Sequence, residues 1–368
     1  MLNIVTIVGT RPEIIKLSCV IPLLDKVSNH TLIHTGQNFD YELNDIFFKD
    51  LKLRNPDIYL NINGGSSIEN ISQILIEVDI LLRKIKPDAV VIYGDTNSCL
   101  SVISAKKLKI PIFHLEAGNR SFDENIPEEL NRKIVDHLSD INLTLNEHAR
   151  RYLLNEGILP DTIFNVGSLL PEVISRNIDD IIKSNVLKNL QLTKGCYFVA
   201  SIHREENVDN RESLSKLLQL FDKVSSYYEI PIILSTHPRT LSKINDFNIK
   251  INNNLLRLVK PMGFFDYLKL QIDSKCVLSD SGTLTEESSI LGFNGIMLRT
   301  THERPEGFDA GVTILNDYNY PHIIDNINTL LLLNKSNKIK DFDCEFVSQK
   351  VIKIILSYVS IIKNRKYG

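Results

Sequence analysis

Acidic side chains are concentrated in one short stretch of the chain. Residues 114–133, HLEAGNRSFDENIPEELNRK, hold five carboxylates and two arginines in twenty positions. They follow IPIF (110–113), which is typical of a buried strand, so the acids begin where the chain leaves its core. Several carboxylates held together can give and take protons, which favours general acid-base chemistry. For any single acid, such as Glu128 after Pro127, a helix start is the more ordinary explanation, because the helix dipole favours acids there.

Two other segments favour the binding of an anion. In GTRPEIIK (9–16), Gly9 permits a tight turn, and Arg11 and Lys16 put cations beside the positive end of a helix. In SDSGTLTEES (279–288), small residues lie at the mouth of a helix and acids follow one turn later, a pattern suited to phosphate and ribose. Read alone, Arg11 could equally be a surface cation. Together the two segments indicate a nucleotide diphosphate.

Further polar residues follow other apolar runs. Asp95 is the second residue of GDTNS (94–98), which directly follows DAVVIY (88–93), and capping the next helix is the ordinary role there. Similar positions are held by His203 and Arg204, by His237 and Arg239, and by His302, Arg304 and Glu306. The three histidines fit no metal-binding spacing, so the sequence predicts no metal site. Neither a GxxxxGK[ST] motif nor a GxGxxG motif after a strand occurs, which argues against a P-loop hydrolase and a dinucleotide cofactor.

The elements that must position these residues form two series of short β-branched runs separated by helical patterns. The first series is predicted at 3–8, 31–35, 88–93, 110–115 and 162–166, and the second at 196–202, 230–236, 255–259, 275–280, 295–299 and 311–315. Runs that are apolar on both faces and joined by helices are typical of parallel sheets. The sequence thus predicts two α/β domains, whose ligands bind beyond the carboxyl ends of the strands.

Length and composition agree with two soluble domains. A chain of 368 residues exceeds what one core usually supports, and we predict domains at 1–170 and 190–340, with a polar linker at 179–195 and a helix at 346–366 that packs back on a sheet. A net charge of −3 argues against nucleic-acid binding. Five scattered cysteines, no signal-peptide pattern and no long apolar run predict a cytoplasmic protein without a membrane segment.

Eight ordered motifs carry a resemblance to a known family. They are VGTRPEIIK, YGDTNS, HLEAGNR, PEELNR, HREEN, HPR, SDSGTLTEES and ERPEG. From about residue 3 to 315 the chain resembles the non-hydrolysing UDP-N-acetylglucosamine 2-epimerases. The resemblance implies two Rossmann-like domains in the GT-B arrangement, an active site in the interdomain cleft, UDP held mainly by the C-terminal domain, and a homodimer. It also implies inversion at carbon 2 of the sugar through loss and re-addition of UDP, without a cofactor or metal.

The same resemblance assigns roles to individual residues. The catalytic positions fall on Asp95, Glu116, Glu128 and His203. The substrate-binding positions fall on Arg11 and Lys16 at the diphosphate, Ser281 and Gly282 at its phosphate oxygens, Glu287 at the ribose, and Arg132, His237 and Arg304 elsewhere. The resemblance leaves open which carboxylate removes the proton and which returns it.

Some residues depart from the usual family pattern. HREEN replaces HRREN, SGTLTEE replaces SGGxQEE, and TGQNFDYEL (35–43) differs from the stretch that helps to bind an allosteric UDP-sugar. These variants favour the subgroup that makes UDP-N-acetyl-L-fucosamine from a UDP-2-acetamido-2,6-dideoxy-L-hexose for capsule or O-antigen. Three alternatives stay open: a UDP-N-acetylglucosamine/UDP-N-acetylmannosamine 2-epimerase, a GT-B glycosyltransferase and a non-catalytic UDP-sugar sensor.

Overall fold

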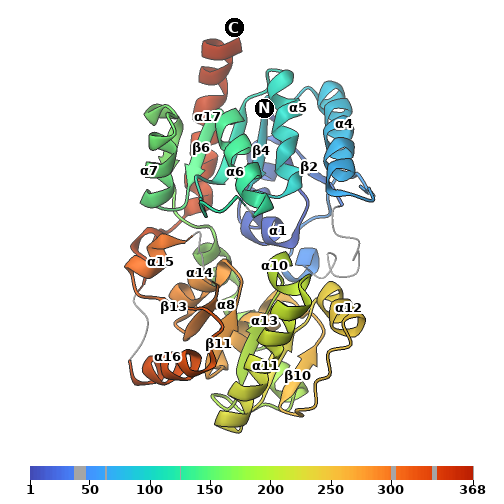
Figure 1. Cartoon of the computed structure of the whole chain (residues 1–368). Coiled ribbons are helices and arrows are strands. Elements are labelled where there is room, and N and C mark those ends of the chain that lie inside the picture. The colour runs from blue at the N-terminus through green and yellow to red at the C-terminus, as the bar shows by residue number, and fades with distance from the viewer. Residues whose placement is uncertain (37–46, 63, 125, 300–303, 334–337, 368) are drawn as a thin grey trace. The chain divides into compact units, whose positions relative to one another are not determined.

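The computed structural model divides into two compact units. Unit 1 comprises Met1–Arg176 with Lys340–Gly368, and unit 2 comprises Asn177–Ile339 (Figure 1). The structure describes residues 1–36, 47–62, 64–124, 126–299, 304–333 and 338–367, without the side chains of residues 205, 206 and 367. Within these ranges no helix is both long enough and apolar enough to cross a membrane.

Unit 1 is built on a parallel sheet of seven strands in its described part, in the order β3-β2-β1-β4-β5-β6-β7. The strands are β1 Asn3–Val8, β2 Asn29–His34, β3 Ile58–Tyr59, β4 Ala89–Tyr93, β5 Ile112–Ala117, β6 Ile141–Thr144 and β7 Ile163–Asn165. All five residues of β4 are buried, as expected of a parallel strand covered on both faces. The strand order reverses between β1 and β4, so the loops after these two strands diverge and leave room for a ligand.

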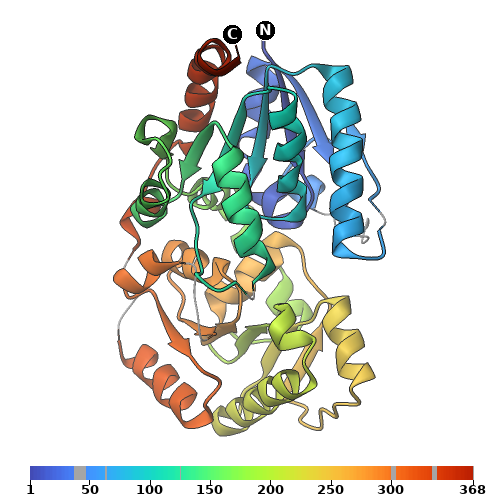
Figure 2. The same cartoon turned by 45° about the horizontal axis from the view of Figure 1, so that its top comes forward.

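Three helices lie side by side over one face of this sheet, α4 Ser67–Ile85, α5 Val102–Lys107 and α6 Pro127–Leu138 (Figure 2). In α4, Ile74, Val78 and Leu82 recur at every fourth position and pack against the apolar strand residues. Other helical segments among the described residues of the first part of the chain include α1 Arg11–Leu17, α2 Ile21–Val27, η1 Asn97–Ser101, α7 Glu147–Asn155, η2 Pro160–Thr162 and α8 Leu170–Ile182.

Unit 2 repeats the design with a parallel sheet of six strands among its described residues, in the order β10-β9-β8-β11-β12-β13. The strands are β8 Phe198–Ser201, β9 Ile232–Ser235, β10 Leu256–Val259, β11 Cys276–Ser279, β12 Gly295–Leu298 and β13 Thr313–Asn316. The helices are α9 Val186–Asn189, α10 Glu205–Val208, α11 Arg211–Tyr228, α12 Pro238–Asp246, α13 Phe264–Asp273, α14 Thr283–Leu291, α15 Pro305–Asp309 and α16 Tyr320–Leu332. The predicted fold class, α/β with two Rossmann-like parallel sheets, is therefore confirmed.

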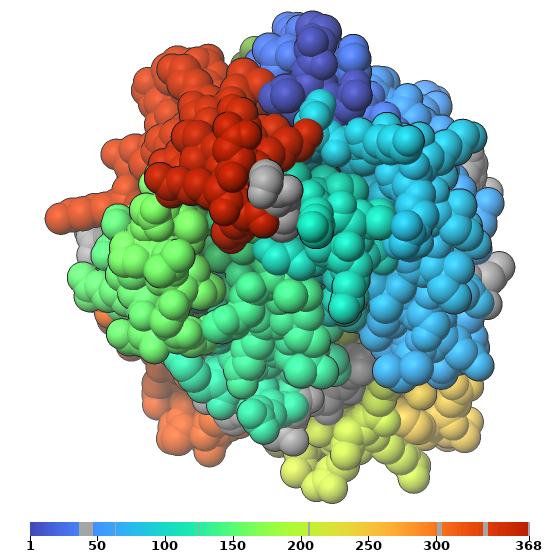
Figure 3. Space-filling view, turned by 90° about the horizontal axis from the view of Figure 1, so that it is seen from above, coloured from blue at the N-terminus to red at the C-terminus, as the bar shows by residue number. Residues whose placement is uncertain are grey.

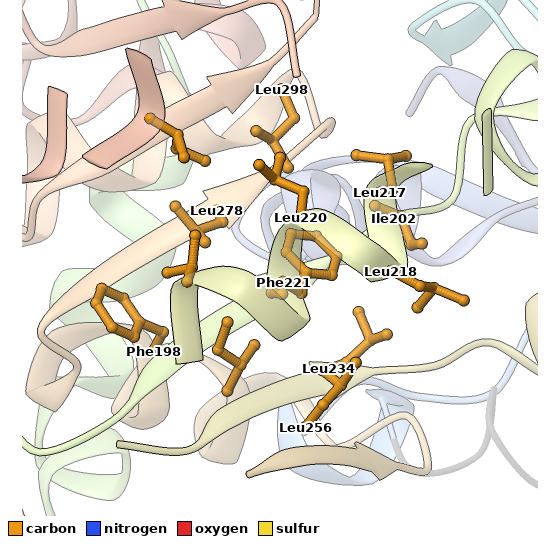
Figure 4. Packing of buried hydrophobic residues seen from close by; sticks show 14 of the residues in the cluster. Phe198, Ile202, Leu217, Leu218, Leu220, Phe221, Leu234, Leu256, Leu278 and Leu298 are labelled. Carbon is orange, nitrogen blue, oxygen red and sulfur yellow. The ribbon is translucent and has the colours of Figure 1, made fainter. Parts of the chain in front are cut away.

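The core of unit 2 forms between its sheet and helices on both faces. On one face, Leu217 and Phe221 of α11 pack against strand residues such as Phe198 and Leu278 (Figure 4). On the other face, α13 and α14 contribute residues such as Leu270 and Leu284. These cores fix the ends of β8 and β11, which carry candidate site residues.

The C-terminal segment belongs to unit 1 in three-dimensional space. Helix α17 (Val347–Ile362) packs against α2, and η4 (Lys363–Tyr367) follows it, while η3 (Lys340–Phe342) precedes it. Lys363 forms an ion pair with Asp88, and Lys366 lies 2.9 Å from Asp140. Figure 3 shows this segment, in red, beside the dark blue residues near the N-terminus.

Four features differ from the prediction in detail. Strand β5 continues to Ala117, two residues beyond the expected end, and β3 and β6 were not predicted. Strand β6 lacks the apolar pattern that identifies a buried strand, because the side chains of Asn142 and Thr144 are polar although both are buried. The segment 179–195, expected as a linker, contains the end of α8 and all of α9.

Candidate active site

The ends of β1 and β4 are joined by a buried carboxylate, that of Glu13. It accepts hydrogen bonds from the backbone N–H groups of Gly9 and Thr10 and from the hydroxyl of Thr96. Burial raises the pKa of Glu13 to about 7, although these hydrogen bonds act in the opposite direction. Glycine is required at position 9, because a Cβ there would clash with the bonded hydroxyls of Thr35 and Ser98. Sequence reasoning missed Glu13 as a residue of the site.

Two predicted diphosphate ligands lie on α1, which follows β1. Arg11 is at the first position of the helix, with its guanidinium 5.7 Å from the centroid of the Phe47 ring. Lys16 is buried, with an exposed fraction of 4%. Arg11 is thus at the start of α1, as predicted, whereas Lys16 lies in the last turn of the helix and not at its positive end. The contact of either cation with a diphosphate stays a prediction.

The predicted residues Asp95 and Arg132 are brought together beyond the end of β4. Nε of Arg132 donates to Oδ2 of Asp95 at 2.7 Å, and Nη1 donates to Oε2 of Glu129 at 3.0 Å. Glu129 is buried, yet its pKa is lowered, because hydrogen bonds from Ser121 and the charge of Arg132 outweigh burial. Glu129 therefore holds Arg132 in place. Its neighbour Glu128, which was predicted to be catalytic, is exposed in the first turn of α6.

Glu116 lies inside the end of β5 and not after it. The strand pairing is irregular between Leu115 and Ala117, and Glu116 has a φ of 65°. This left-handed conformation is unusual for a residue other than glycine and turns the side chain out of the regular strand pattern. Its Oε2 accepts from the hydroxyl of Tyr93, and its Oε1 accepts from Nδ2 of Asn119 at 3.2 Å.

A buried charge network supports the end of β5, which holds Glu116, and the loop that follows it. Nη1 of Arg120 donates to Oδ2 of Asp136 at 2.7 Å, and both side chains are fully buried. Nδ1 of His114 lies 2.8 Å from Oδ1 of Asp136, and its Nε2 lies 2.8 Å from the carbonyl oxygen of Gly94. Burial acts to raise the pKa of Asp136, but His114 and Arg120 lower it overall. The network links β5, α6 and the loop after β4.

In unit 2, His203 follows β8 and meets a buried carboxylate. Its side chain is 51% exposed, and its Nδ1 lies 3.0 Å from Oδ1 of Asp280, which is fully buried. Asp280 follows β11, the neighbour of β8 in the sheet. Sequence reasoning did not select Asp280, although it lies beside the predicted Ser281.

The predicted phosphate and ribose residues lie around the start of α14. Ser281 Oγ is 3.0 Å from Thr283 Oγ1, and Gly282 is the N-cap of the helix. Glu287, one turn later, is 9% exposed and accepts from Nε2 of Gln271 at 2.7 Å. A small-residue helix start followed by a carboxylate is therefore present, as the sequence predicts.

Two other predicted binding residues occupy helix starts of unit 2. Nδ1 of His237 accepts from the backbone N–H of Arg239 at 3.3 Å and caps α12. Arg304 is the N-cap of α15, is buried, and lies 3.9 Å from Oε1 of Glu306. Their contact with substrate stays a prediction. His302 and residues 37–43 lie outside the described residues, and in the described part of the chain no three His, Cys, Asp or Glu side chains group as a metal site.

The fold and these strand-end residues define an α/β protein with cations, helix starts and carboxylates at the places where such folds bind phosphorylated ligands. Residues 24–358 match the family model described as UDP-N-acetylglucosamine 2-epimerase. The chain belongs to this family, whose named members are isomerases.

Three relatives extend this finding. A Rickettsia bellii UDP-N-acetylglucosamine 2-epimerase structure is 44% identical and covers 100% of this chain and 99% of that one, with a TM-score of 0.92. The Methanocaldococcus jannaschii enzyme of that name is 37% identical over 95% of this chain and 97% of its own length. Its crystal structure in complex with UDP-GlcNAc and UDP is 36% identical over 96% of this chain and 99% of that one, with a TM-score of 0.90. The UDP-2,3-diacetamido-2,3-dideoxy-D-glucuronate 2-epimerase of Pseudomonas aeruginosa is 32% identical over 85% of this chain and 88% of its own length.

Proposed function

We propose that this chain epimerises a UDP-2-acetamido hexose at carbon 2. In the first stage the proton on carbon 2 is removed, the bond from carbon 1 to UDP breaks, and a 2-acetamidoglycal forms. In the second stage UDP adds back to carbon 1 and a proton reaches the opposite face of carbon 2. The two stages balance without an oxidant or reductant, so positioned acids, bases and cations suffice.

The observation that carries the proposal is the convergence of carboxylates at the ends of adjacent strands. Asp95 follows β4 and Glu116 lies in the end of β5, which pairs with β4. Proton transfer at two faces of one carbon needs more than one such group. The proposed catalytic set is Asp95, Glu116, Glu128 and His203, and the proposed substrate-binding set is Arg11, Lys16, Arg132, His237, Ser281, Gly282, Glu287 and Arg304.

Two substrates compete within this proposal. Departures from the family pattern favour a UDP-2-acetamido-2,6-dideoxy-L-hexose, with UDP-N-acetyl-L-fucosamine as the product for capsule or O-antigen. The names of the relatives favour UDP-N-acetylglucosamine, and their similarity covers nearly the whole chain. Because the departures concern few residues, we give UDP-N-acetylglucosamine first place. The proposal also includes a homodimer, which rests on the family resemblance alone, and a cytoplasmic location, which rests on the composition and patterns of the sequence.

Proton exchange at carbon 2 provides the test. The protein is incubated in deuterium oxide with UDP-sugars of the D-gluco, D-manno and 6-deoxy-L series, and NMR follows carbon 2. We expect deuterium at carbon 2 and a second epimer with one of these sugars alone, without an acceptor. A glycosyltransferase would need an acceptor, and a sensor would bind the nucleotide without exchange. The absence of deuterium from every sugar would refute epimerisation.

A further inference from the structure

The carboxylate of Asp280 is surrounded by hydrogen-bond donors of the segment that follows β8. Its Oδ2 accepts from the backbone N–H of Arg204 at 3.2 Å and from Nδ2 of Asn207 at 2.9 Å. The backbone N–H of His203 lies 3.2 Å from both oxygens, and Nδ1 of His203 lies 3.0 Å from Oδ1. The loop that carries His203 is thus wrapped around one buried anion.

This environment keeps Asp280 ionised. Full burial acts to raise its pKa, but the charge of His203 and the hydrogen bonds lower the pKa to about 2. An ionised carboxylate accepts hydrogen bonds and donates none. Nδ1 of His203 must therefore carry a proton, whether the ring is neutral or cationic. Since Nδ1 is engaged with Asp280, Nε2 is the ring nitrogen available for a ligand.

A second layer fixes the carboxylate itself. The hydroxyl of Tyr318 lies 3.1 Å from Oδ1 of Asn207, so Asn207 presents its amide N–H to Asp280. Asn207 is buried, with an exposed fraction of 3%. The backbone carbonyl of Asp280 accepts from Nε of Arg299, the residue that follows β12. The position of His203 thus depends on groups from three neighbouring parts of the sheet.

We infer that Asp280 is a positioning residue, which holds His203 in the tautomer with the proton on Nδ1 and directs Nε2 toward the substrate. The inference rests on the proposed function for the identity of that substrate. In its neutral form His203 then offers a lone pair at Nε2, and in its cationic form it offers an N–H that can donate to an oxygen of UDP.

Replacement by asparagine separates the charge from the shape. In Asp280→Asn, one oxygen can still accept from Arg204 and Asn207 on the Oδ2 side. The new amide N–H₂ then faces His203, whose Nδ1 can accept only if its proton moves to Nε2. The variant should therefore carry the opposite tautomer with the loop otherwise retained.

Nitrogen-15 NMR of labelled histidine measures this directly. Comparison with His203→Gln assigns the His203 signals among the nine histidines. Near pH 8 we expect protonated Nδ1 in the wild-type protein and protonated Nε2 in Asp280→Asn. A wild-type ring protonated on Nε2 and not on Nδ1 would overturn the inference, and this measurement needs no variant of Asp280 and no turnover.

Kinetics with the UDP-sugar that exchanges deuterium give the second test. We expect kcat of Asp280→Asn to fall about 100-fold with KM changed by less than about threefold. The matched control is Asp273→Asn, which also removes a buried carboxylate of unit 2, one paired with Lys194 and Lys269. It should lower the melting temperature and leave kcat unchanged. Equal losses of kcat in both variants would overturn the inference, as would an unchanged kcat in Asp280→Asn.

The two tests separate the inference from the proposed function. If no UDP-sugar is epimerised but the tautomer changes as expected, the proposed function fails and the pairing of Asp280 with His203 stands. If epimerisation occurs and the tautomer is unchanged in Asp280→Asn, the proposed function stands and the positioning role is refuted.

Discussion

Glu116 in unit 1 and His203 in unit 2 are both held by a residue at the end of the neighbouring strand, but the partners differ in charge. Tyr93, the last residue of β4, donates its hydroxyl to Glu116 of β5. Asp280, directly after β11, accepts from His203, which follows β8. Each unit's sheet therefore places a partner beside the site residue on the neighbouring strand, and this partner is a neutral donor in unit 1 and a buried anion in unit 2.

The difference suits the two side chains. In the proposed reaction a carboxylate such as Glu116 must change its charge, and the neutral Tyr93 and Asn119 can remain beside it in either state. An imidazole has two tautomers, and the permanent negative charge of Asp280 selects one of them. Neutral partners thus allow a group to titrate, whereas a charged partner fixes where its proton resides.

The largest effect is expected from Glu116→Gln, which removes the carboxylate that can gain and lose a proton beside Tyr93 and Asn119. Its kcat should fall by about 100-fold to 10,000-fold, because general acid-base catalysis contributes that much. The affinity for UDP, measured by calorimetry, should stay close to that of the wild-type protein. The control is Glu124→Gln, since Glu124 is 89% exposed and its pairing with Lys133 at 3.5 Å is weak. Unchanged turnover in Glu116→Gln would remove this residue from the mechanism.

A smaller effect, on the free energy of unfolding, is expected from Glu13→Gln. Glu13 is also a carboxylate held between the ends of neighbouring strands, but its burial shifts its pKa more than its hydrogen bonds do. Its pKa is raised from 4.5 to about 7, so the folded protein binds its proton more tightly than the unfolded chain. The resulting stabilisation is complete below pH 4.5 and is lost as the pH rises through 7. Relative to Glu13→Gln, the wild-type protein should lose on the order of 3 kcal/mol of unfolding free energy across this window.

Denaturant unfolding at pH 5 and pH 8 checks the difference between these two proteins. Glu124→Gln again serves as the control, because an exposed carboxylate should give the same difference from the wild-type protein at both values. A difference for Glu13→Gln that does not change with pH would show that the hydrogen bonds from Gly9, Thr10 and Thr96 compensate burial fully.

The sequence predicts the strands of both sheets well because their apolar runs are local. DAVVIY and KCVLSD coincide closely with β4 and β11. It also places Asp95, Glu116 and His203 at strand ends, since motif and strand are contiguous. Glu116 was expected after its strand, and its left-handed conformation inside β5 has no signal in the residue type.

The partners that hold the site residues were not predictable in this way. His203 and Asp280 are 77 positions apart, and Tyr93 and Glu116 are 23 apart. Only the pairing of β8 with β11 and of β4 with β5 makes these residues neighbours, and the residues of the individual strands do not reveal which strands pair. Buried polar residues such as Asn142 in β6 also break the apolar pattern that identifies a strand.

The smallest effect is expected from Tyr93→Phe, which tests the neutral side of the contrast between the two units. The ring stays buried, and Glu116 loses one hydrogen bond from a neutral donor while the hydrogen bond from Asn119 remains. Since a hydrogen bond to a charged carboxylate contributes about 1.5 kcal/mol or more, kcat should fall at least about tenfold, and we expect less than in Asp280→Asn. Tyr228→Phe is the control, because it removes a hydroxyl that bonds Asn328 at 2.8 Å in the packing of unit 2. If Tyr93→Phe matched or exceeded the loss in Asp280→Asn, the hydroxyl would have to act as a proton donor in the reaction, and the distinction between neutral and charged partners would fail.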